Sequence, residues 1–409
     1  MAQTPFFQSR FCPDWSCCSR AASLTTLIGL GLFLTPALLM AGFSVDDVSV
    51  NEGDSGLAQL VFTVTLDACW VSFCSVDFNT IDGTAVAGSD YIASSYFVAT
   101  LFSPIPQQFP LTVPVYSGTQ VELTETLYAL LTDPVGATID DAGGYGEIVN
   151  DDSTYVRIWA NSNGFAGEGN PVGIRVRLYG VVDATVLAYY ETADQTAQVV
   201  DGDYLPRAGA ALFDPAAIPQ TVPFDVTTLS DAKVELDETF ITSLTGINAS
   251  GRDVTIDPGW VTTIGTIVNN DSAAVTITDV DGEEGDVGTS TFTFTVGLDA
   301  EVDVGVDVDF ATADGTATVA DNDYVSDFGT LLFAGSAGET ETVPVTVNGD
   351  VDVEPDENFF VDLSNIFASG RSVILADSQG EGIILTDEAE IFSDGFEGGD
   401  TSAWSQTVP

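Results

Sequence analysis

Residues 312–320 read TADGTATVA, and Asn322-Asp323-Tyr324 follows almost at once. The same signature occurs twice earlier, as TIDGTAVAG (80–88) before Ser89-Asp90-Tyr91 and as TADQTAQVV (192–200) before Gly202-Asp203-Tyr204. Outward from it, an acidic-aromatic stretch follows each copy, as VELTETLYALL (121–131), VELDETFITSL (234–244) and VEPDENFFVDL (353–363). Upstream, Glu52, Glu168 and Glu284 recur every 116 residues. One structural unit is therefore repeated three times along the chain.

Each unit has the pattern of β-strands. Apolar and polar residues alternate across 60–66, 172–178 and 292–298, as expected for strands with one buried face. Asp82-Gly83 and Asp314-Gly315 predict tight turns, and no stretch after residue 41 shows helical periodicity. The sequence predicts an all-β protein of three tandem immunoglobulin-like antiparallel β-sandwiches, with cores that include the tyrosines of the Asp-Tyr pairs, Phe240 and Phe359.

The predicted boundaries follow from the repeats. We expect a signal peptide at 1–41, β-sandwich domains at 43–152, 153–271 and 272–389, and a short acidic aromatic tail at 390–409. The seams hold no Gly/Ser-rich or Pro-rich linker, which favours an end-to-end rod over a flexible string.

The charge balance excludes several functions. The chain has 62 Asp and Glu, 9 Lys and Arg and no His, giving a formal net charge of −53. Such a surface repels nucleic acid, and the absence of His removes Ser-His-Asp and Cys-His nucleophiles and His-ligated zinc. Divalent cations, which take carboxylate oxygens, are the expected partners.

The N-terminus predicts export. Arg10 and Arg20 precede the apolar run 24–41, and a cleavage site after Ala41 is favoured over an uncleaved anchor. Three cysteines lie before residue 41; Cys69 and Cys74 remain, and an oxidising compartment favours a disulfide between them over two buried thiols. The protein is expected to be secreted or held at the cell surface.

Acidic residues occupy equivalent places in the loops of every unit. Each unit has a Glu-Gly pair, the Asp of Asp-Tyr, a Glu-x-x-Glu pair and a closing acidic segment. Alternate loops of an antiparallel sandwich gather at one end, so these segments would supply the six to eight oxygens that calcium requires.

The order of these motifs resembles the Calx-β domain of sodium–calcium exchangers, integrin β4 and bacterial surface proteins. The resemblance covers about residues 43–389 and implies calcium sites in loops at one end of each sandwich, near the next domain. Transferred by position, the implied ligands are Glu52, Asp90, Glu122, Glu125, Asp151 and Asp152 in the first unit, Glu168, Asp203, Asp231, Glu235, Glu238 and Asp271 in the second, and Glu284, Asp323, Asp350, Glu354, Glu357 and Asp387 in the third.

The units depart from this pattern in different ways. Gly118 replaces a loop Asp in the first unit, Asn269 and Asn270 replace carboxylates in the second, and Thr386 and Glu388 replace aspartates in the third. We therefore expect unequal affinities, with the first unit weakest.

These features predict a non-enzymatic calcium-binding rod for adhesion, matrix or cell-surface architecture. Two alternatives are a calcium-independent spacer and a protein- or glycan-interaction module. Trp70, Trp159 and Trp260 could stack on sugars, although they do not recur at equivalent positions. A carboxylate-pair hydrolase is disfavoured because the acidic residues repeat with the fold.

The tail 390–409 resembles a short segment at the C-termini of exported proteins from Gram-negative bacteria. A strand that caps the last domain is the alternative.

Overall fold

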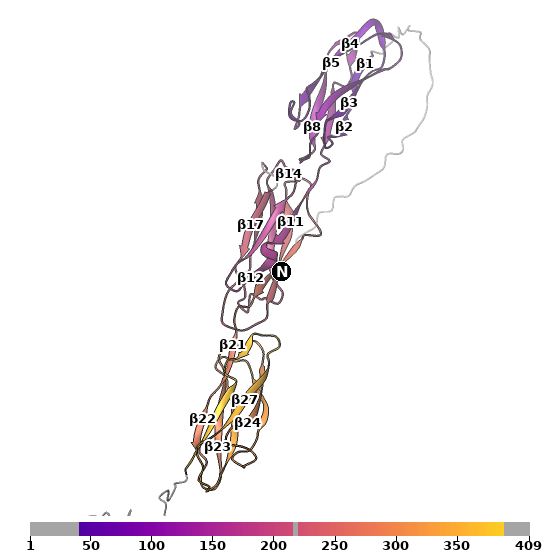
Figure 1. Ribbon diagram of the computed structural model, residues 1–409. Coiled ribbons are helices and arrows are strands. Elements are labelled where there is room, and N and C mark those ends of the chain that lie inside the picture. The colour runs from indigo at the N-terminus through magenta and orange to yellow at the C-terminus, as the bar shows by residue number, and fades with distance from the viewer. Residues whose placement is uncertain (1–40, 216–219, 388–409) are drawn as a thin grey trace, which may run out of the picture.

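The computed structural model describes residues 41–215 and 220–387. Within these ranges the chain forms three β-sandwiches arranged end to end as a rod (Figure 1). Residues 1–40 of the predicted signal peptide 1–41, with its three cysteines, and the predicted tail 390–409 lie outside the described residues. In the described ranges, no helix is long and apolar enough to cross a membrane.

The strands of domain 1 are β1 (Gly42–Val45), β2 (Val48–Asn51), β3 (Leu57–Leu66), β4 (Cys69–Asp82), β5 (Ser95–Ser103), β6 (Gln107–Tyr116), β7 (Gln120–Val121), β8 (Glu125–Val135), β9 (Thr138–Ile139) and β10 (Gly143–Val149). Domain 2 consists of β11 (Thr154–Ala160), the short 3-10 turn η1 (Asn161–Gly164), β12 (Phe165–Gly167), β13 (Val172–Leu178), β14 (Val181–Val182), β15 (Val186–Asp194), β16 (Ala208–Phe213), β17 (Gln220–Val226), β18 (Glu238–Asn248), β19 (Val254–Ile256) and β20 (Thr262–Val268). Domain 3 consists of β21 (Ala273–Ile277), β22 (Val280–Glu283), β23 (Gly288–Leu298), β24 (Val306–Asp314), β25 (Phe328–Phe333), β26 (Thr340–Gly349), β27 (Glu357–Phe367), β28 (Val373–Leu375) and β29 (Gln379–Leu385).

Each domain packs a four-stranded sheet against a five-stranded one. The four-stranded sheets have the orders β6-β3-β1-β9, β17-β13-β11-β19 and β26-β23-β21-β28. The five-stranded sheets have the orders β2-β10-β8-β4-β5, β12-β20-β18-β15-β16 and β22-β29-β27-β24-β25. The all-β prediction of three tandem sandwiches is confirmed.

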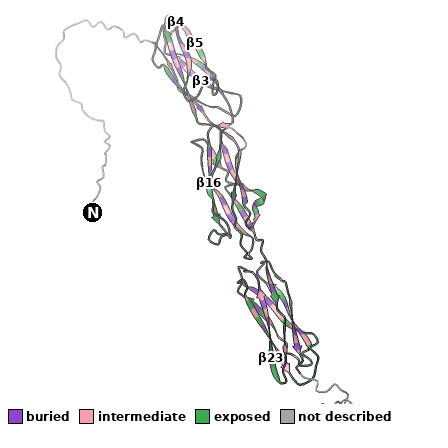
Figure 2. Ribbon diagram, turned by 90° about the vertical axis from the view of Figure 1, so that its left-hand side faces the viewer, coloured by how far each residue is buried: buried purple, intermediate pink, exposed green. Residues whose placement is uncertain are grey.

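The predicted alternation places one face of each strand in the core, as Figure 2 shows. Leu60, Phe62, Val64 and Leu66 on β3 are fully buried. Each buried side chain of this size contributes about 1.5–3 kcal/mol to folding. The predicted core aromatics are confirmed by their burial and, in domains 2 and 3, by stacked Tyr204–Phe240 and Tyr324–Phe359 pairs whose ring centroids are 4.7 Å apart.

Domain 1 starts with two short strands, β1 and β2, which belong to different sheets. β1 pairs with β3 in the four-stranded sheet, whereas β2 pairs with β10 in the other sheet. Two aspartates lie at the crossing: Asp46 Oδ1 accepts the Thr63 amide, and Asp47 Oδ1 accepts the Tyr145 amide at 2.7 Å. These carboxylates satisfy amides that the crossing strand leaves without a backbone acceptor.

A short parallel strand pair joins domain 1 to domain 2. Val121 of β7 pairs with Val182 of β14, and both side chains are buried. The second junction repeats this contact, since Val234 bridges Val302 in the parallel sense. The same backbone bond closes each junction: Asp183 donates to Val121 O and Asp303 donates to Val234 O, both at 3.2 Å.

An arginine fork lies beside each junction. Arg252 donates through Nε and Nη2 to the two carboxylate oxygens of Asp183 at 2.7 Å. Arg371 binds Asp303 in the same way at 2.6 Å. Both junctions therefore have the same construction, which is consistent with the rod that the short seams predict.

Candidate metal centre

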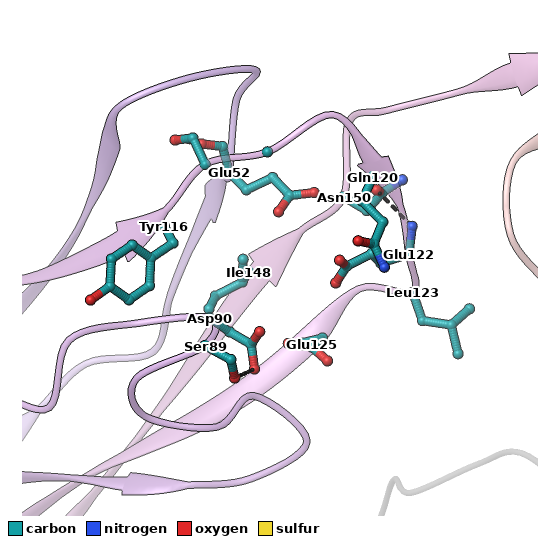
Figure 3. Close-up of a pocket in the computed structure, with 12 residues that line it drawn as sticks. Glu52, Ser89, Asp90, Tyr116, Gln120, Glu122, Leu123, Glu125, Ile148 and Asn150 are labelled. Carbon is teal, nitrogen blue, oxygen red and sulfur yellow. Dashed lines mark hydrogen bonds between the residues drawn. The ribbon is translucent and has the colours of Figure 1, made fainter. Parts of the chain in front are cut away.

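Acidic loop segments of domain 1 meet at the end that faces domain 2. Figure 3 shows Glu52 after β2, Asp90 from the β4–β5 loop and Glu122 and Glu125 around the start of β8, directed toward one cavity. The cavity has a volume of about 140 Å³. Because a water molecule needs only about 10–15 Å³ of such space, the cavity is large enough for a cation together with bound waters.

The Asp-Tyr loop fixes the position of Asp90. The Tyr91 hydroxyl donates to Asp82 Oδ1 at 2.6 Å, and Asp90 Oδ2 accepts the Val86 amide at 2.7 Å. One oxygen of Asp90 thus holds the loop, and the carboxylate still reaches the cluster. The Tyr204–Asp194 and Tyr324–Asp314 hydrogen bonds repeat this arrangement at 2.6 Å.

An asparagine side chain connects the closing acidic segment to the Glu-x-x-Glu segment. Asn150 Oδ1 accepts the Glu122 amide at 3.1 Å, and its Nδ2 donates to Asp152 O at 3.0 Å. Asn269 makes the equivalent bonds to Glu235 and Asp271. Asn269, expected from the sequence to replace a carboxylate ligand, hydrogen-bonds the backbone of two of the loops.

Ligand atoms of three carboxylates lie within 4.8 Å of one another in each of four groups. These groups are Asp90, Glu122 and Glu125; Glu168, Asp231 and Asp271; Asp203, Glu235 and Glu238; and Asp323, Glu354 and Glu357. Domain 2 contributes two groups, and a single cavity is lined by members of both. This proximity is the geometry that the sequence predicts.

Burial, together with the neighbouring carboxylates, raises the pKa values of these glutamates. Burial, followed by the charges of Glu122 and Asp152, raises the pKa of Glu52 to about 7. Burial and then the charge of Asp90 raise the pKa of Glu125 to about 7. A bound divalent cation would reverse this balance, because an opposite charge favours the ionised carboxylate.

The other domains show the same effect. Burial, with Asp271 and Asp231, raises the pKa of Glu168 to about 7, and burial with the hydrogen bond that protonated Glu238 donates to Asp203 raises the pKa of Glu238 to about 8. Burial also raises the pKa values of Glu354 and Glu357, with Asp323 as the next cause.

Several carboxylate oxygens at these ends are buried without a hydrogen-bond partner in the described structure. They are Oε1 of Glu52, Oδ2 of Asp152, Oε2 of Glu168, Oδ2 of Asp271 and Oδ1 of Asp387. A buried carboxylate oxygen without a donor is costly, and a hard cation would satisfy it.

Six predicted ligands lie outside the four groups: Glu52, Asp151, Asp152, Glu284, Asp350 and Asp387. Asp151 is exposed, and its Oδ1 accepts the Gly53 amide at 3.1 Å. Asp350 is exposed and accepts the Asp352 amide, although its charge still raises the pKa of Glu354. Glu284 is buried, at 8% exposure. Calcium ligation by the full predicted set stays a prediction.

Two features of the site escape sequence reasoning. The first is the role of Asp82, Asp194 and Asp314, which precede the repeated turn and accept the tyrosine hydroxyls. Their recurrence in all three units could have indicated this shared role. Lys233 donates to Glu235 beside the second domain's carboxylates. It occurs once, with Gln120 and Asp352 at the equivalent positions, so no repeat marks it.

Cys69 and Cys74 form a disulfide at the opposite end of domain 1, far from its carboxylates. The bond belongs to the irregular start of β4, where the register with β5 shifts between Cys69 and Phe73.

Comparison with known proteins identifies the repeated unit. The sequence profile of the Calx-beta domain matches residues 38–158, 166–281 and 270–388. Similar solved structures include the CBD12 fragment of CALX1.2, with 21% identity, coverage of 53% of this chain and 83% of that chain, and a TM-score of 0.26. CBD12 of CALX1.1 has 21% identity, 52% and 82% coverage and a TM-score of 0.25, and the apo-form Calx CBD1 domain has 24% identity, 28% and 98% coverage and a TM-score of 0.24. No curated protein matches the chain.

Proposed function

The chain belongs to the Calx-β domain family, and from this premise we propose that it is an exported calcium-binding rod used in adhesion, matrix or cell-surface architecture. The main support for calcium binding is the group of buried carboxylate oxygens at the loop ends that have no hydrogen-bond donor. The structure also brings together four groups of three carboxylates, whose ligand atoms are all oxygens. This ligand set suits calcium, which takes six to eight oxygens in flexible geometry.

The position of the sites supports a role in stiffening the rod. Glu122 follows directly after the junction residue Val121, and Glu235 follows Val234. The Arg252–Asp183 pair of domain 2 is close enough to Glu122 for Asp183 to raise, and Arg252 to lower, the pKa of that carboxyl. A cation bound by domain 1 would therefore order loops that also contact domain 2.

The test is thermal unfolding with excess chelator, with calcium and with magnesium. A ligand that binds only the folded state stabilises it by about 2.7 kcal/mol at one hundred times its Kd. We expect calcium to raise the melting temperature, chelator to reverse the rise, and Glu354→Gln with Glu357→Gln to reduce it for domain 3.

A matched control removes two charges away from the clusters. Glu191→Gln with Glu341→Gln changes the net charge equally, and neither residue belongs to a three-carboxylate group. This control should keep the full calcium response. A melting temperature indifferent to calcium in the parent protein would leave the calcium-independent spacer as the better function.

A further inference from the structure

Positive charge after residue 41 is concentrated in domain 2. Of the seven Lys and Arg residues there, only Arg371 lies in domain 3, and none lies in domain 1. Arg157, Arg175 and Arg177 share one surface, the outer face of the β17-β13-β11-β19 sheet. A cationic cluster on a chain with net charge −53 is a local exception.

The register places these arginines side by side. Arg157 of β11 pairs with Arg177 of β13, and Trp159 pairs with Arg175. Directly paired residues have Cβ atoms about 4.5–5.5 Å apart, and Arg175 and Arg177 are separated by about 7 Å along one strand. The guanidinium groups therefore originate from one compact area.

Aromatic rings pack against two of these arginines. The Arg157 guanidinium lies 4.9 Å from the ring centroids of both Tyr155 and Tyr179, and that of Arg177 lies 4.7 Å from Tyr179. The ring of Trp260, 44% exposed, lies 5.4 Å from Arg157. Such cation–π contacts preorganise the arginines before any partner arrives.

The charges on this face are only partly compensated. Arg157 pairs with Asp257 at 2.7 Å. Arg175 and Arg177 form no ion pair within the described ranges, and Arg177 Nε is buried without a hydrogen-bond partner. In the described ranges, neither guanidinium group is therefore neutralised by a carboxylate of this chain.

The other two domains show that the fold does not need these side chains. By register, Arg157, Arg175 and Arg177 correspond to Ser44, Thr63 and Thr65 in domain 1 and to Thr276, Thr295 and Gly297 in domain 3. Tyr179 corresponds to Asp67 and Asp299, which would oppose an anion. The same sheet folds with small polar residues, so the arginine-aromatic face is a property of domain 2 alone.

We propose that this face binds an acidic polysaccharide, with Arg175 and Arg177 contacting its carboxylates and Trp260 contacting a sugar ring. Arginine forks match carboxylates in bidentate geometry, and aromatic rings pack against the apolar faces of sugars. An open sheet face suits an extended polymer rather than an enclosed small molecule. The proposal is independent of the calcium sites, which lie in loops at the domain ends.

Binding to polygalacturonate, with neutral dextran as the uncharged comparison, tests the proposal. The titration uses the whole protein with chelator present, so that calcium cannot bridge the polymer to the carboxylate clusters. We expect polygalacturonate to bind, dextran not to bind, and affinity to fall as salt is raised from 0.15 M to 0.5 M, about twofold or more, because screening weakens exposed charge pairs.

Variants locate the binding to this face. Arg175→Thr with Arg177→Thr installs residues that domain 1 carries at the same register, and we expect at least a tenfold loss of affinity. Arg207→Thr removes a charge from elsewhere in domain 2 and should change affinity less than twofold. The melting temperature of each variant reports whether domain 2 remains folded, and Trp260→Ala supplies an independent loss on the same face.

Four results would overturn the proposal. The parent protein fails to bind polygalacturonate, or the double Thr variant, still folded, binds it as well as the parent. Alternatively, the parent binds single-stranded DNA more tightly than polygalacturonate, or self-associates through Arg175 and Arg177 in sedimentation analysis, which would assign the face to another partner.

Discussion

The two aspartates around each Asp-Tyr loop have separate roles. Asp194 accepts the Tyr204 hydroxyl and the Val199 amide, whereas Asp203 accepts the Gln198 amide and joins Glu235 and Glu238. The tyrosine therefore connects the core to the acidic loop. Its hydrogen bond is the residue-level contact on which the position of the candidate ligand depends.

Tyr204→Phe tests this connection. The ring keeps its stacking on Phe240, but the hydroxyl bond to a carboxylate is lost, which should lower the stability of domain 2 by about 1–2 kcal/mol. Calorimetry should show the domain 2 transition lowered by roughly 4–8 °C. Tyr189→Phe is the control, because Tyr189 is 41% exposed, and it should leave this transition in place.

Lys233 gives domain 2 a built-in cation beside its carboxylates. Lys233→Gln installs the residue that domain 1 has at this position, and removal of the like charge should strengthen calcium binding by domain 2. We expect on the order of a tenfold lower Kd, equivalent to about 1.4 kcal/mol. Calorimetric titration measures it. Lys233→Arg should retain the parent affinity, and an unchanged Kd for the Gln variant would mean that Lys233 and calcium do not compete.

At the level of elements, the strands could be predicted from the sequence, but the point at which the chain passes from one sheet to the other could not. Alternation along β3, β13 and β23 is local in the sequence, so it predicts the buried faces correctly. The split between β1 and β2 depends on Asp47 reaching Tyr145, 98 residues away. A contact over that distance leaves no periodic signal in the sequence.

The candidate site, too, could be predicted only in part from the sequence. Its acidic segments were predictable because they recur in order, and the structure brings most of them together. The junction forks were not predicted, since Arg371 and Asp303 lie 68 residues apart and have no counterpart in domain 1. Lys233 was missed because it occurs in one unit only.

Each fork lies within one domain and holds the aspartate whose backbone amide bonds across the junction, so we expect it to fix the angle between neighbouring domains indirectly. Arg371→Gln removes two charge-assisted hydrogen bonds to Asp303, and we expect the second junction to bend more freely. Small-angle X-ray scattering should show a shorter maximum dimension, while Arg207→Gln, which changes the same charge away from the junction, should keep the parent profile. If Arg371→Gln scatters like the parent, the Val234–Val302 pairing alone sets the angle.

At the scale of the whole molecule, the clustered carboxylates make stability depend on pH. Glu52, Glu125 and Glu168 have folded pKa values of about 7 and Glu238 about 8, above the ordinary value of 4.5. Between pH 4.5 and 8 the unfolded chain therefore loses these protons first, so the folded state becomes less stable as pH rises. Asp82 and Asp314 have lowered pKa values and contribute fully throughout this range.

The metal-free protein should consequently melt at a higher temperature at pH 5 than at pH 8. Calcium should raise the melting temperature more at pH 8, where its carboxylate ligands are ionised, and so flatten the dependence. Scanning calorimetry across this range, with and without calcium, measures both effects. A chelated protein whose stability increases from pH 5 to pH 8 would contradict the raised pKa values.

The parallel pairing of β2 with β10, β12 with β20 and β22 with β29 has a mechanical consequence. In each domain it joins a strand near the entry of the chain to the strand at its exit, so tension along the rod slides the two past each other in shear. All the hydrogen bonds of a pair then bear the load together instead of opening one by one. The pair in domain 2 spans three residue positions against four in the other domains, and in single-molecule stretching domain 2 should yield at the lowest force.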